Sequence, residues 1–361
     1  MTVSIDVPAG AAAPRLCIAG SLMGRTPGKI TTQGEILGDT LLEAGWHVIF
    51  TSSVESRALR LLDVVRTLVL ERRAYDVLLV QTYSGRSFVL ADVASALGGW
   101  LGKGVILHLH GGALPEFLDR HPWWGRRVLS RGTLLVTPSE FLARAARRFG
   151  FEPRVIPNVV DVAAYGFRRR DAVQPVLFWM RSFHDLYDPE MAVRVLARVR
   201  RVYGNATLVM AGPDKGREVY VRKLAAELGL SGAVRFAGFL DLAGKRRESS
   251  EADIFLNTNR VDNQPVSVLE ACAMGLPVVA TAVGGIPDLL VHEETGLLVP
   301  AGDDEAMAEA VLRLVAEPGL AGRLSSNGRR LAEQSAPVEI LRRWRDVLGG
   351  PAPFASRGEA T

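Results

Sequence analysis

Short apolar runs alternate with segments of helical periodicity from one end of this sequence to the other. Residues 16–20 and 46–50 are two such runs, and the segment 34–45 between them places Ile36, Leu37 and Leu41 on one helical face. Continuous apolar strands that alternate with helices are typical of a parallel sheet buried on both faces. The sequence therefore predicts an α/β protein.

The alternation lapses once, in a polar connector near residues 157–170, and restarts with an apolar strand at 176–180. Because 361 residues exceed the usual size of one domain, we predict two Rossmann-like, doubly wound domains facing across a cleft. The expected parts are an N-terminal domain over 1–165, a second domain over 166–335, a helix over 336–348 that packs back toward the first domain, and a disordered tail over 349–361.

Composition and cysteine usage exclude several classes of protein. Hydrophobic residues make up 48% and charged residues 23% of the chain, which excludes wholesale disorder. The two cysteines, Cys17 and Cys272, lie in separate apolar runs and form neither a disulfide framework nor a zinc-ligand spacing. No apolar run is long enough to span a membrane, and the start lacks the pattern of a secretory signal. We expect a cytoplasmic protein.

The most informative stretch runs from Asp262 to Pro300. It contains an acid, seven further residues and Glu270, then Ala-x-x-x-Gly-x-Pro-Val-Val-x-Thr, Gly-Gly-Ile-Pro and Thr-Gly-Leu-Leu-Val. A loop that enters a helix near Pro265 directs free N–H groups and the positive end of the helix dipole toward an anion. Glu270, about one turn further, can accept hydrogen bonds from ribose hydroxyls. These features predict a site for a diphosphate and a ribose.

This stretch resembles the nucleotide-sugar motif of the retaining glycosyltransferases of family 4, which have the GT-B fold. The resemblance implies transfer of a sugar from a nucleoside-diphosphate sugar to an acceptor hydroxyl, in the synthesis of a glycan, polysaccharide or glycoconjugate. It implies neither a cofactor nor a metal. The family usually has Glu where this chain has Asp262. The motif Asp-Asn-x-Pro-Val-Ser-x-x-Glu-Ala is nevertheless similar to the motif of a subgroup of these enzymes.

The resemblance also implies the site residues. Arg181 matches the family's diphosphate-binding arginine, Asp262 its sugar-binding acid, and His110 a histidine that reaches the donor sugar; these three are the predicted catalytic residues. Phe239 matches a position beside the nucleobase, although a buried packing role is an alternative. The predicted donor-binding residues are Glu270, Gly28, Gly212, Phe239, Asn263, Gln264, Pro265, Val266 and Ser267.

One cation of the family is missing. The family has a Lys a few residues after the arginine, whereas this chain has Leu-Tyr-Asp-Pro at 186–189, and Lys215 is the candidate replacement. No Asp-x-Asp motif occurs, so fixed protein charge is expected to stabilise the leaving diphosphate. The resemblance implies same-face attack, in which the leaving phosphate accepts the proton of the acceptor.

Several alternatives remain open. His108 and His110 lie on the same side of a strand, which allows a metal pair, but no third ligand follows at a recognisable spacing. A nucleotide-sugar epimerase with the GT-B fold and a catalytically silent sugar-nucleotide-binding subunit are the alternatives to a transferase. The nucleobase, the sugar and the acceptor, which can be a glycan, a lipid-linked or a small molecule, are not specified; no nucleic acid is expected.

A basic segment in the first half suggests a further contact. Residues 120–154 contain eight Arg against two Glu, and the adjacent Trp123 and Trp124 precede Arg126 and Arg127. Indole rings amid arginines are suited to the headgroup region of an anionic membrane. The segment therefore predicts either peripheral contact with the inner face of a membrane or a solvated face in which one tryptophan packs into the core.

Overall fold

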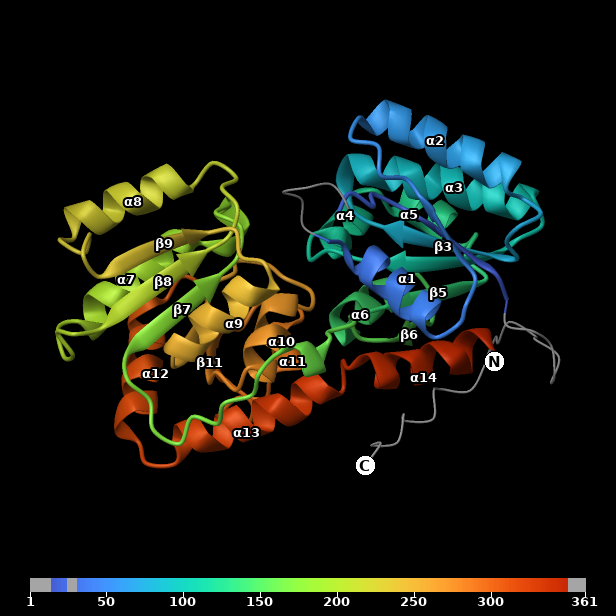
Figure 1. Cartoon of the computed structure of the whole chain (residues 1–361). Coiled ribbons are helices and arrows are strands. Elements are labelled where there is room, and N and C mark those ends of the chain that lie inside the picture. The colour runs from blue at the N-terminus through green and yellow to red at the C-terminus, as the bar shows by residue number, and fades with distance from the viewer. Residues whose placement is uncertain (1–13, 25–30, 350–361) are drawn as a thin grey trace, which may run out of the picture. The chain divides into compact units, whose positions relative to one another are not determined.

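The computed structural model describes residues 14–24 and 31–349, which form two compact units. Unit 1 comprises the chain up to Val159 together with the segment from Pro337, and unit 2 comprises Val160–Ala336. The division falls after residue 159, inside the polar connector, where we predicted it after residue 165. Each unit contains a six-stranded parallel sheet (Figure 1). The predicted α/β class with two Rossmann-like domains is confirmed.

The sheet of unit 1 has the order β2-β1-β3-β4-β5-β6. The order reverses between β1 and β3, so the loops after these strands flank a topological switch point. The strands are β1 (Leu16–Ala19), β2 (Val48–Thr51), β3 (Val77–Thr82), β4 (Gly104–Leu109), β5 (Leu134–Thr137) and β6 (Arg154–Val155). The helices are α1 (Gln33–Glu43), α2 (Arg57–Leu70), η1 (Gly85–Ser87), α3 (Phe88–Trp100), α4 (Leu114–Arg120), α5 (Pro122–Leu129), α6 (Glu140–Arg148) and α14 (Pro337–Leu348).

The sheet of unit 2 has the order β12-β11-β10-β7-β8-β9, and its switch point lies between β7 and β10. The strands are β7 (Val176–Met180), β8 (Thr207–Ala211), β9 (Val234–Gly238), β10 (Ile254–Asn257), β11 (Val278–Thr281) and β12 (Leu297–Val299). The helices are η2 (Val162–Ala164), η3 (Asp185–Tyr187), α7 (Pro189–Val199), α8 (Glu218–Glu227), α9 (Leu242–Glu251), α10 (Val266–Ala273), α11 (Ile286–Leu289), α12 (Asp304–Ala316) and α13 (Leu320–Glu333).

Both sheets are buried on both faces, which explains why their strands are apolar without alternation. In β1, Leu16 belongs to one hydrophobic cluster and Cys17 to another. In β7, Trp179 and Phe178 divide in the same way between two clusters. Trp344 of α14 packs in the same cluster as Leu16, so this C-terminal helix belongs to the core of unit 1.

None of the helices in the described ranges is long and apolar enough to cross a membrane.

Candidate functional site

Two predicted catalytic residues meet at the switch point of unit 2. Arg181 is the first residue after β7, and Asp262 follows β10; their side chains form an ion pair and are only 17% and 13% exposed. The Arg181 guanidinium also lies over the ring of Tyr187, 4.1 Å from its centroid. The carboxyl ends of two neighbouring strands thus bring together residues that are 81 positions apart.

The Asp262 carboxylate is held on both of its oxygens. The Asn259 amide donates to Oδ2 at 2.6 Å, and the backbone N–H of Asn263 donates to Oδ1 at 2.7 Å. Gly284 (φ 56°) lies against the backbone of Asp262, where an added Cβ would come within 1.9 Å of the Asp262 carbonyl oxygen. This glycine is therefore required for the loop after β11 to approach the acid.

The predicted Gly212 has a similar role beside Arg181. A Cβ at this position would lie 1.8 Å from the Arg181 carbonyl oxygen, and its φ of 142° disfavours other residues. Its backbone N–H donates to the carbonyl of Gly238 at the end of β9.

Phe239 is the residue after Gly238 and is 53% exposed, so the alternative that this ring is buried and packs in the core is wrong. The ring is accessible at the carboxyl edge of the sheet.

The other predicted donor-binding residues lie at or just before the start of α10. Asn263 and Gln264 are buried in the preceding loop, and Pro265 is the residue before the first helical turn, which contains Val266 and Ser267. The first N–H groups of any α-helix have no partner within the helix. The Ser267 hydroxyl is buried and has no hydrogen-bond partner within the described structure. This end of α10 therefore offers donors to an anion.

Glu270 lies in α10 and is 7% exposed. The Tyr165 hydroxyl donates to Oε1 at 2.7 Å, and the Lys245 ammonium contacts the same oxygen at 2.6 Å. Tyr165 precedes the first strand of unit 2, and Lys245 lies on α9. Sequence reasoning missed both partners, because neither belongs to a motif and each is distant from Glu270 along the chain.

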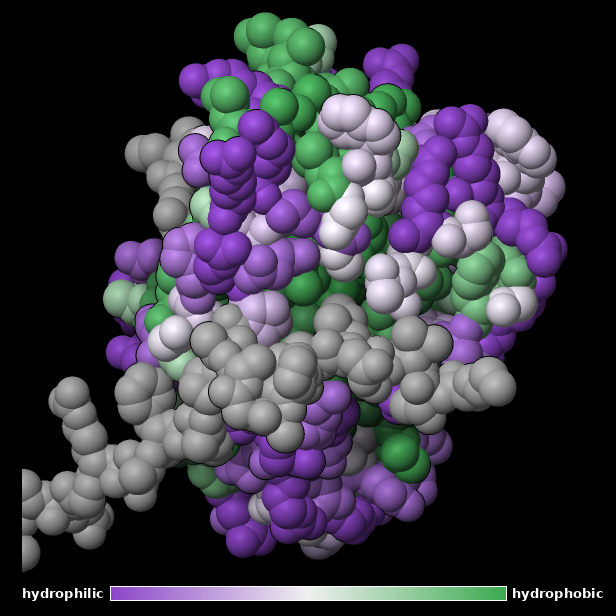
Figure 2. Space-filling view, turned by 90° about the vertical axis from the view of Figure 1, so that its right-hand side faces the viewer, coloured by the Kyte–Doolittle hydropathy of each residue, from purple (hydrophilic) through white to green (hydrophobic). Residues whose placement is uncertain are grey.

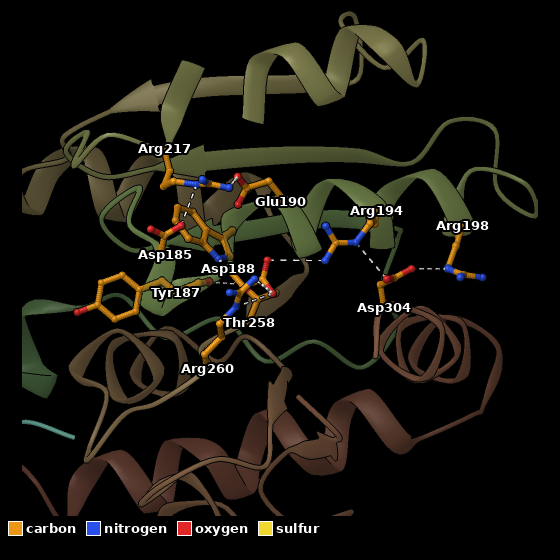
Figure 3. Close-up of polar contacts among 11 residues, drawn as sticks. Asp185, Tyr187, Asp188, Glu190, Arg194, Arg198, Arg217, Thr258, Arg260 and Asp304 are labelled. Carbon is orange, nitrogen blue, oxygen red and sulfur yellow. Dashed lines mark hydrogen bonds and ion pairs between the residues drawn. The ribbon is translucent and has the colours of Figure 1, made fainter. Parts of the chain in front are cut away.

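A chain of ion pairs starts at Asp188, within the segment 186–189 where the resemblance predicts a Lys (Figure 3). Asp188, at the start of α7, is 3% exposed and accepts from the Arg260 guanidinium at 3.1 Å. Arg194 lies 3.7 Å from the same carboxylate and also contacts Asp304. Lys215, the predicted replacement, is exposed on the loop after β8, and its side chain makes no ion pair with the predicted site residues in the described ranges.

The predicted His110 is the first residue after β4 in unit 1 and is 4% exposed. Its ring stacks on Tyr83, with centroids 5.1 Å apart, and lies 4.0 Å from the ring of His108. Burial lowers the pKa of His110 to about 3, and burial followed by the neighbouring His110 lowers the pKa of His108 well below its usual value. Both imidazoles are therefore neutral near pH 7.

Unpartnered polar atoms gather beside His110. Its Nε2, both nitrogens of His108 and the amide of Gln81 are buried without hydrogen-bond partners in the described structure. Gln81 and His108 are register partners on β3 and β4, so they lie next to each other. Buried polar atoms are normally satisfied, so each of these groups is able to bind a ligand hydroxyl or a water molecule. Over residues 14–24 and 31–349, no group of three or more potential metal ligands is found.

The loop after β1 is anchored by Glu35. Its carboxylate accepts from the backbone N–H of Gly24 at 2.8 Å and from the N–H and hydroxyl of Thr32, both at 2.8 Å. Thr32 and Glu35 form a capping box at the start of α1. Gly28, predicted to approach the donor, lies outside the described residues.

Several arginines of the basic segment of unit 1 are paired with carboxylates. Arg147 pairs with Glu140 and Glu152, and Arg148 pairs with Asp119. Trp124 packs edge-on against Phe88 and donates its indole N–H to Asp92 at 2.7 Å. Trp124 therefore packs against α3, and the prediction that both tryptophans contact a membrane is wrong for this residue. Trp123 is 72% exposed, with Arg127 5.4 Å from its ring centroid.

A cavity of about 400 Å³ in unit 2 is lined by the connector and α9, and its charged lining residues are Arg168, Arg170 and Arg246. None of the predicted site residues lines it. The candidate site of unit 2 is therefore defined by the residues at the carboxyl edge of its sheet and not by this cavity.

Two family models match the chain. Residues 38–164 match the model described as Glycosyltransferase Family 4, and residues 174–317 match the model described as Glycosyl transferases group 1. The lipopolysaccharide core biosynthesis glycosyltransferase LpsE of Rhizobium meliloti is 33% identical over 49% of this chain and 52% of its own length. The phosphatidyl-myo-inositol mannosyltransferase of Mycobacterium leprae is 29% identical over 62% of this chain. The chain spans about half to three fifths of the length of these relatives.

Solved structures share the fold over nearly the whole chain. HepE of Anabaena, in complex with UDP and glucose, has a TM-score of 0.74 at 20% identity and covers 93% of this chain and 99% of its own. Sucrose-phosphate synthase of Thermosynechococcus elongatus has a TM-score of 0.76 at 18% identity and covers 92% of this chain and 98% of its own. These likenesses confirm the GT-B fold, and the family models support a glycosyltransferase of family 4.

Proposed function

We propose that this protein transfers a sugar from a nucleoside-diphosphate sugar to an acceptor hydroxyl, with retention of configuration, in the synthesis of a glycan or glycoconjugate. The observation that carries the proposal is the grouping of Arg181, Asp262 and the start of α10 around the switch point of unit 2, with Glu270 further along the same helix. This is where open α/β sheets bind ligands. The names of the relatives and the UDP-bound neighbours support the same reading.

The chemistry places negative charge on the leaving diphosphate. As the bond between the anomeric carbon and the phosphate oxygen breaks, Arg181 and the N-terminus of α10 stabilise the charge on that oxygen. The acceptor oxygen forms its bond to the same face of the anomeric carbon, and its proton passes to the leaving phosphate. Asp262 holds Arg181 and accepts from a sugar hydroxyl, and neutral His110 bonds a further sugar hydroxyl.

In this proposal the diphosphate is stabilised by protein charge without a divalent cation. The test is to incubate the protein with UDP-, GDP- and ADP-sugars, with and without an acceptor mixture, in excess chelator. We expect release of one nucleoside diphosphate that depends on the acceptor. A strict requirement for Mg²⁺ or Mn²⁺ contradicts the metal-free mechanism. Interconversion of two sugars on the nucleotide indicates an epimerase, and binding without turnover indicates a silent subunit.

We also propose peripheral contact between unit 1 and an anionic membrane, which would present a lipid-linked acceptor. Trp123 is exposed next to Arg126 and Arg127 on α5. Hydrophobic residues gather at the top of the face in Figure 2, which is the part of unit 1 that carries α2, and Leu59 and Leu62 of this helix are 57% and 64% exposed. Exposed apolar and basic residues together bind anionic bilayers.

Co-sedimentation with anionic vesicles at low and high salt tests this contact. We expect binding that falls with salt and is weakened by Trp123→Ala combined with Arg126→Glu and Arg127→Glu. Equal binding by this variant, or no binding by the unaltered protein, contradicts the proposed membrane contact and favours a water-soluble acceptor.

A further inference from the structure

The Glu270 carboxylate is held from one side only. Tyr165 and Lys245 come from two different segments of unit 2, the connector and α9, and both donate to Oε1, at 2.7 and 2.6 Å. Within the described residues no hydrogen bond reaches Oε2. The side chains of Glu270 and Lys245 are 10% and 25% exposed, and Tyr165 is 9% exposed.

This arrangement pairs the carboxylate with an opposite charge in partly buried surroundings. A buried carboxylate is destabilising unless it is paired, and the Lys245 ammonium supplies the opposite charge. Burial, and then the charge of Glu270, raises the pKa of Tyr165 well above its usual value, so its hydroxyl stays protonated and acts as a donor. Two donors on one oxygen fix the rotation of the carboxylate and leave the other oxygen able to accept hydrogen bonds.

The pairing also removes an electrostatic conflict. The start of α10 is the proposed diphosphate site, and Glu270 follows it on the same helix. A carboxylate without a counter-charge on the same short helix repels a diphosphate bound at the helix start. A Glu–Lys pair, in contrast, carries no net charge. Neutralisation by Lys245 therefore allows a ribose acceptor and an anion site to share one short helix.

From these contacts we propose that Tyr165 and Lys245 are positioning residues that hold Oε1 of Glu270 and present Oε2 to the ribose hydroxyls of the bound nucleotide. The inference rests on the proposed function, because it takes Glu270 as the ribose-binding group. A purely structural role, in which the contacts only attach the connector to α9 and α10, is the outcome that the experiment must separate from it.

The probes are UDP, GDP and ADP, each compared by calorimetry with its 2′,3′-dideoxy counterpart. The unaltered protein is expected to bind one of the three and to bind its dideoxy counterpart about tenfold or more weakly, as for loss of hydrogen bonds to a charged group. In Tyr165→Phe and Lys245→Met, affinity for the ribose form should fall about five- to tenfold, whereas affinity for the dideoxy form should change less than about twofold. The ratio of the affinities for the ribose and dideoxy forms is then largely lost.

Matched controls come from α8 of the same unit. Tyr220 and Lys223 are exposed on this helix, and Lys223 pairs with Glu227 at the surface. Tyr220→Phe and Lys223→Met should leave both affinities unchanged, and Lys245→Arg should restore most of the discrimination because it keeps the charge. Melting temperatures confirm that each variant is folded.

Two results overturn the proposal in different ways. Equal losses for the ribose and dideoxy forms in Tyr165→Phe and Lys245→Met, or no loss for either form, show that these residues do not act through the ribose. If the unaltered protein binds none of UDP, GDP and ADP, the proposed function itself fails, and the positioning role fails with it.

Discussion

The candidate site residues of the two units differ in charge and in the state of their hydrogen bonds. In unit 2, Arg181, Asp262 and Glu270 form ion pairs and hydrogen bonds with charged or polar partners. In unit 1, His108 and His110 are neutral, and both ring nitrogens of His108 and the Nε2 of His110 are buried without partners in the described structure. Paired charges suit an anionic ligand, and neutral unpartnered groups suit a hydroxyl. In the proposed function, this difference suits the paired charges of unit 2 to the nucleotide and the unpartnered histidine of unit 1 to a sugar hydroxyl.

Removal of Arg181 should have the largest effect. Arg181→Ala should lower kcat by about two orders of magnitude or more, as for loss of an electrostatic stabiliser of the transition state. Steady-state kinetics measure this, and Arg198→Ala is the control, because Arg198 lies on α7 and pairs with Asp304 at 2.6 Å. A kcat for Arg181→Ala equal to that of the control would assign the leaving-group charge to another residue.

A change in unit 1 should separate turnover from nucleotide binding. His110→Ala should lower kcat/KM about tenfold, because one hydrogen bond to a sugar hydroxyl is lost. Its Kd for the nucleoside diphosphate should stay within about twofold of the unaltered value. If calorimetry instead shows that His110→Ala weakens nucleotide binding as strongly as Arg181→Ala does, the division of roles between the units is wrong.

The neutral histidine also predicts a pH dependence of stability. The pKa of His110 is about 3 in the folded protein, against 6.5 when unperturbed, so between these values the unfolded state binds a proton that the folded state does not. The free energy of unfolding should therefore decrease as the pH is lowered through this window, by about 1.4 kcal/mol for each pH unit. In denaturant unfolding at pH 6, 5 and 4, His110→Gln should lower this slope by the same amount. Parallel curves would show that His110 is not buried as a neutral group.

Most of the fold was predictable from the sequence, because strands buried on both faces read as continuous apolar runs. The spaced motif after Asp262 also identified the residues at the switch point, since loops after neighbouring parallel strands must meet at one edge. The partners of Glu270 were not predictable. Tyr165 lies 105 positions before it and Lys245 25 positions before it, and only tertiary packing brings them to one oxygen. The exposure of Trp123 and the partial burial of Trp124 likewise depend on how α5 packs against α3.

The most direct test of the central claim is calorimetric titration of the nucleoside diphosphate into the unaltered protein and into Glu270→Gln. Gln is nearly isosteric but uncharged, so it loses the charge-assisted hydrogen bonds to ribose, which contribute about 1.5 to 3 kcal/mol. The account predicts that one of UDP, GDP and ADP binds the unaltered protein and that its Kd rises about tenfold or more in the variant. An unchanged Kd would contradict the assignment of Glu270 to the ribose and of unit 2 to the nucleotide.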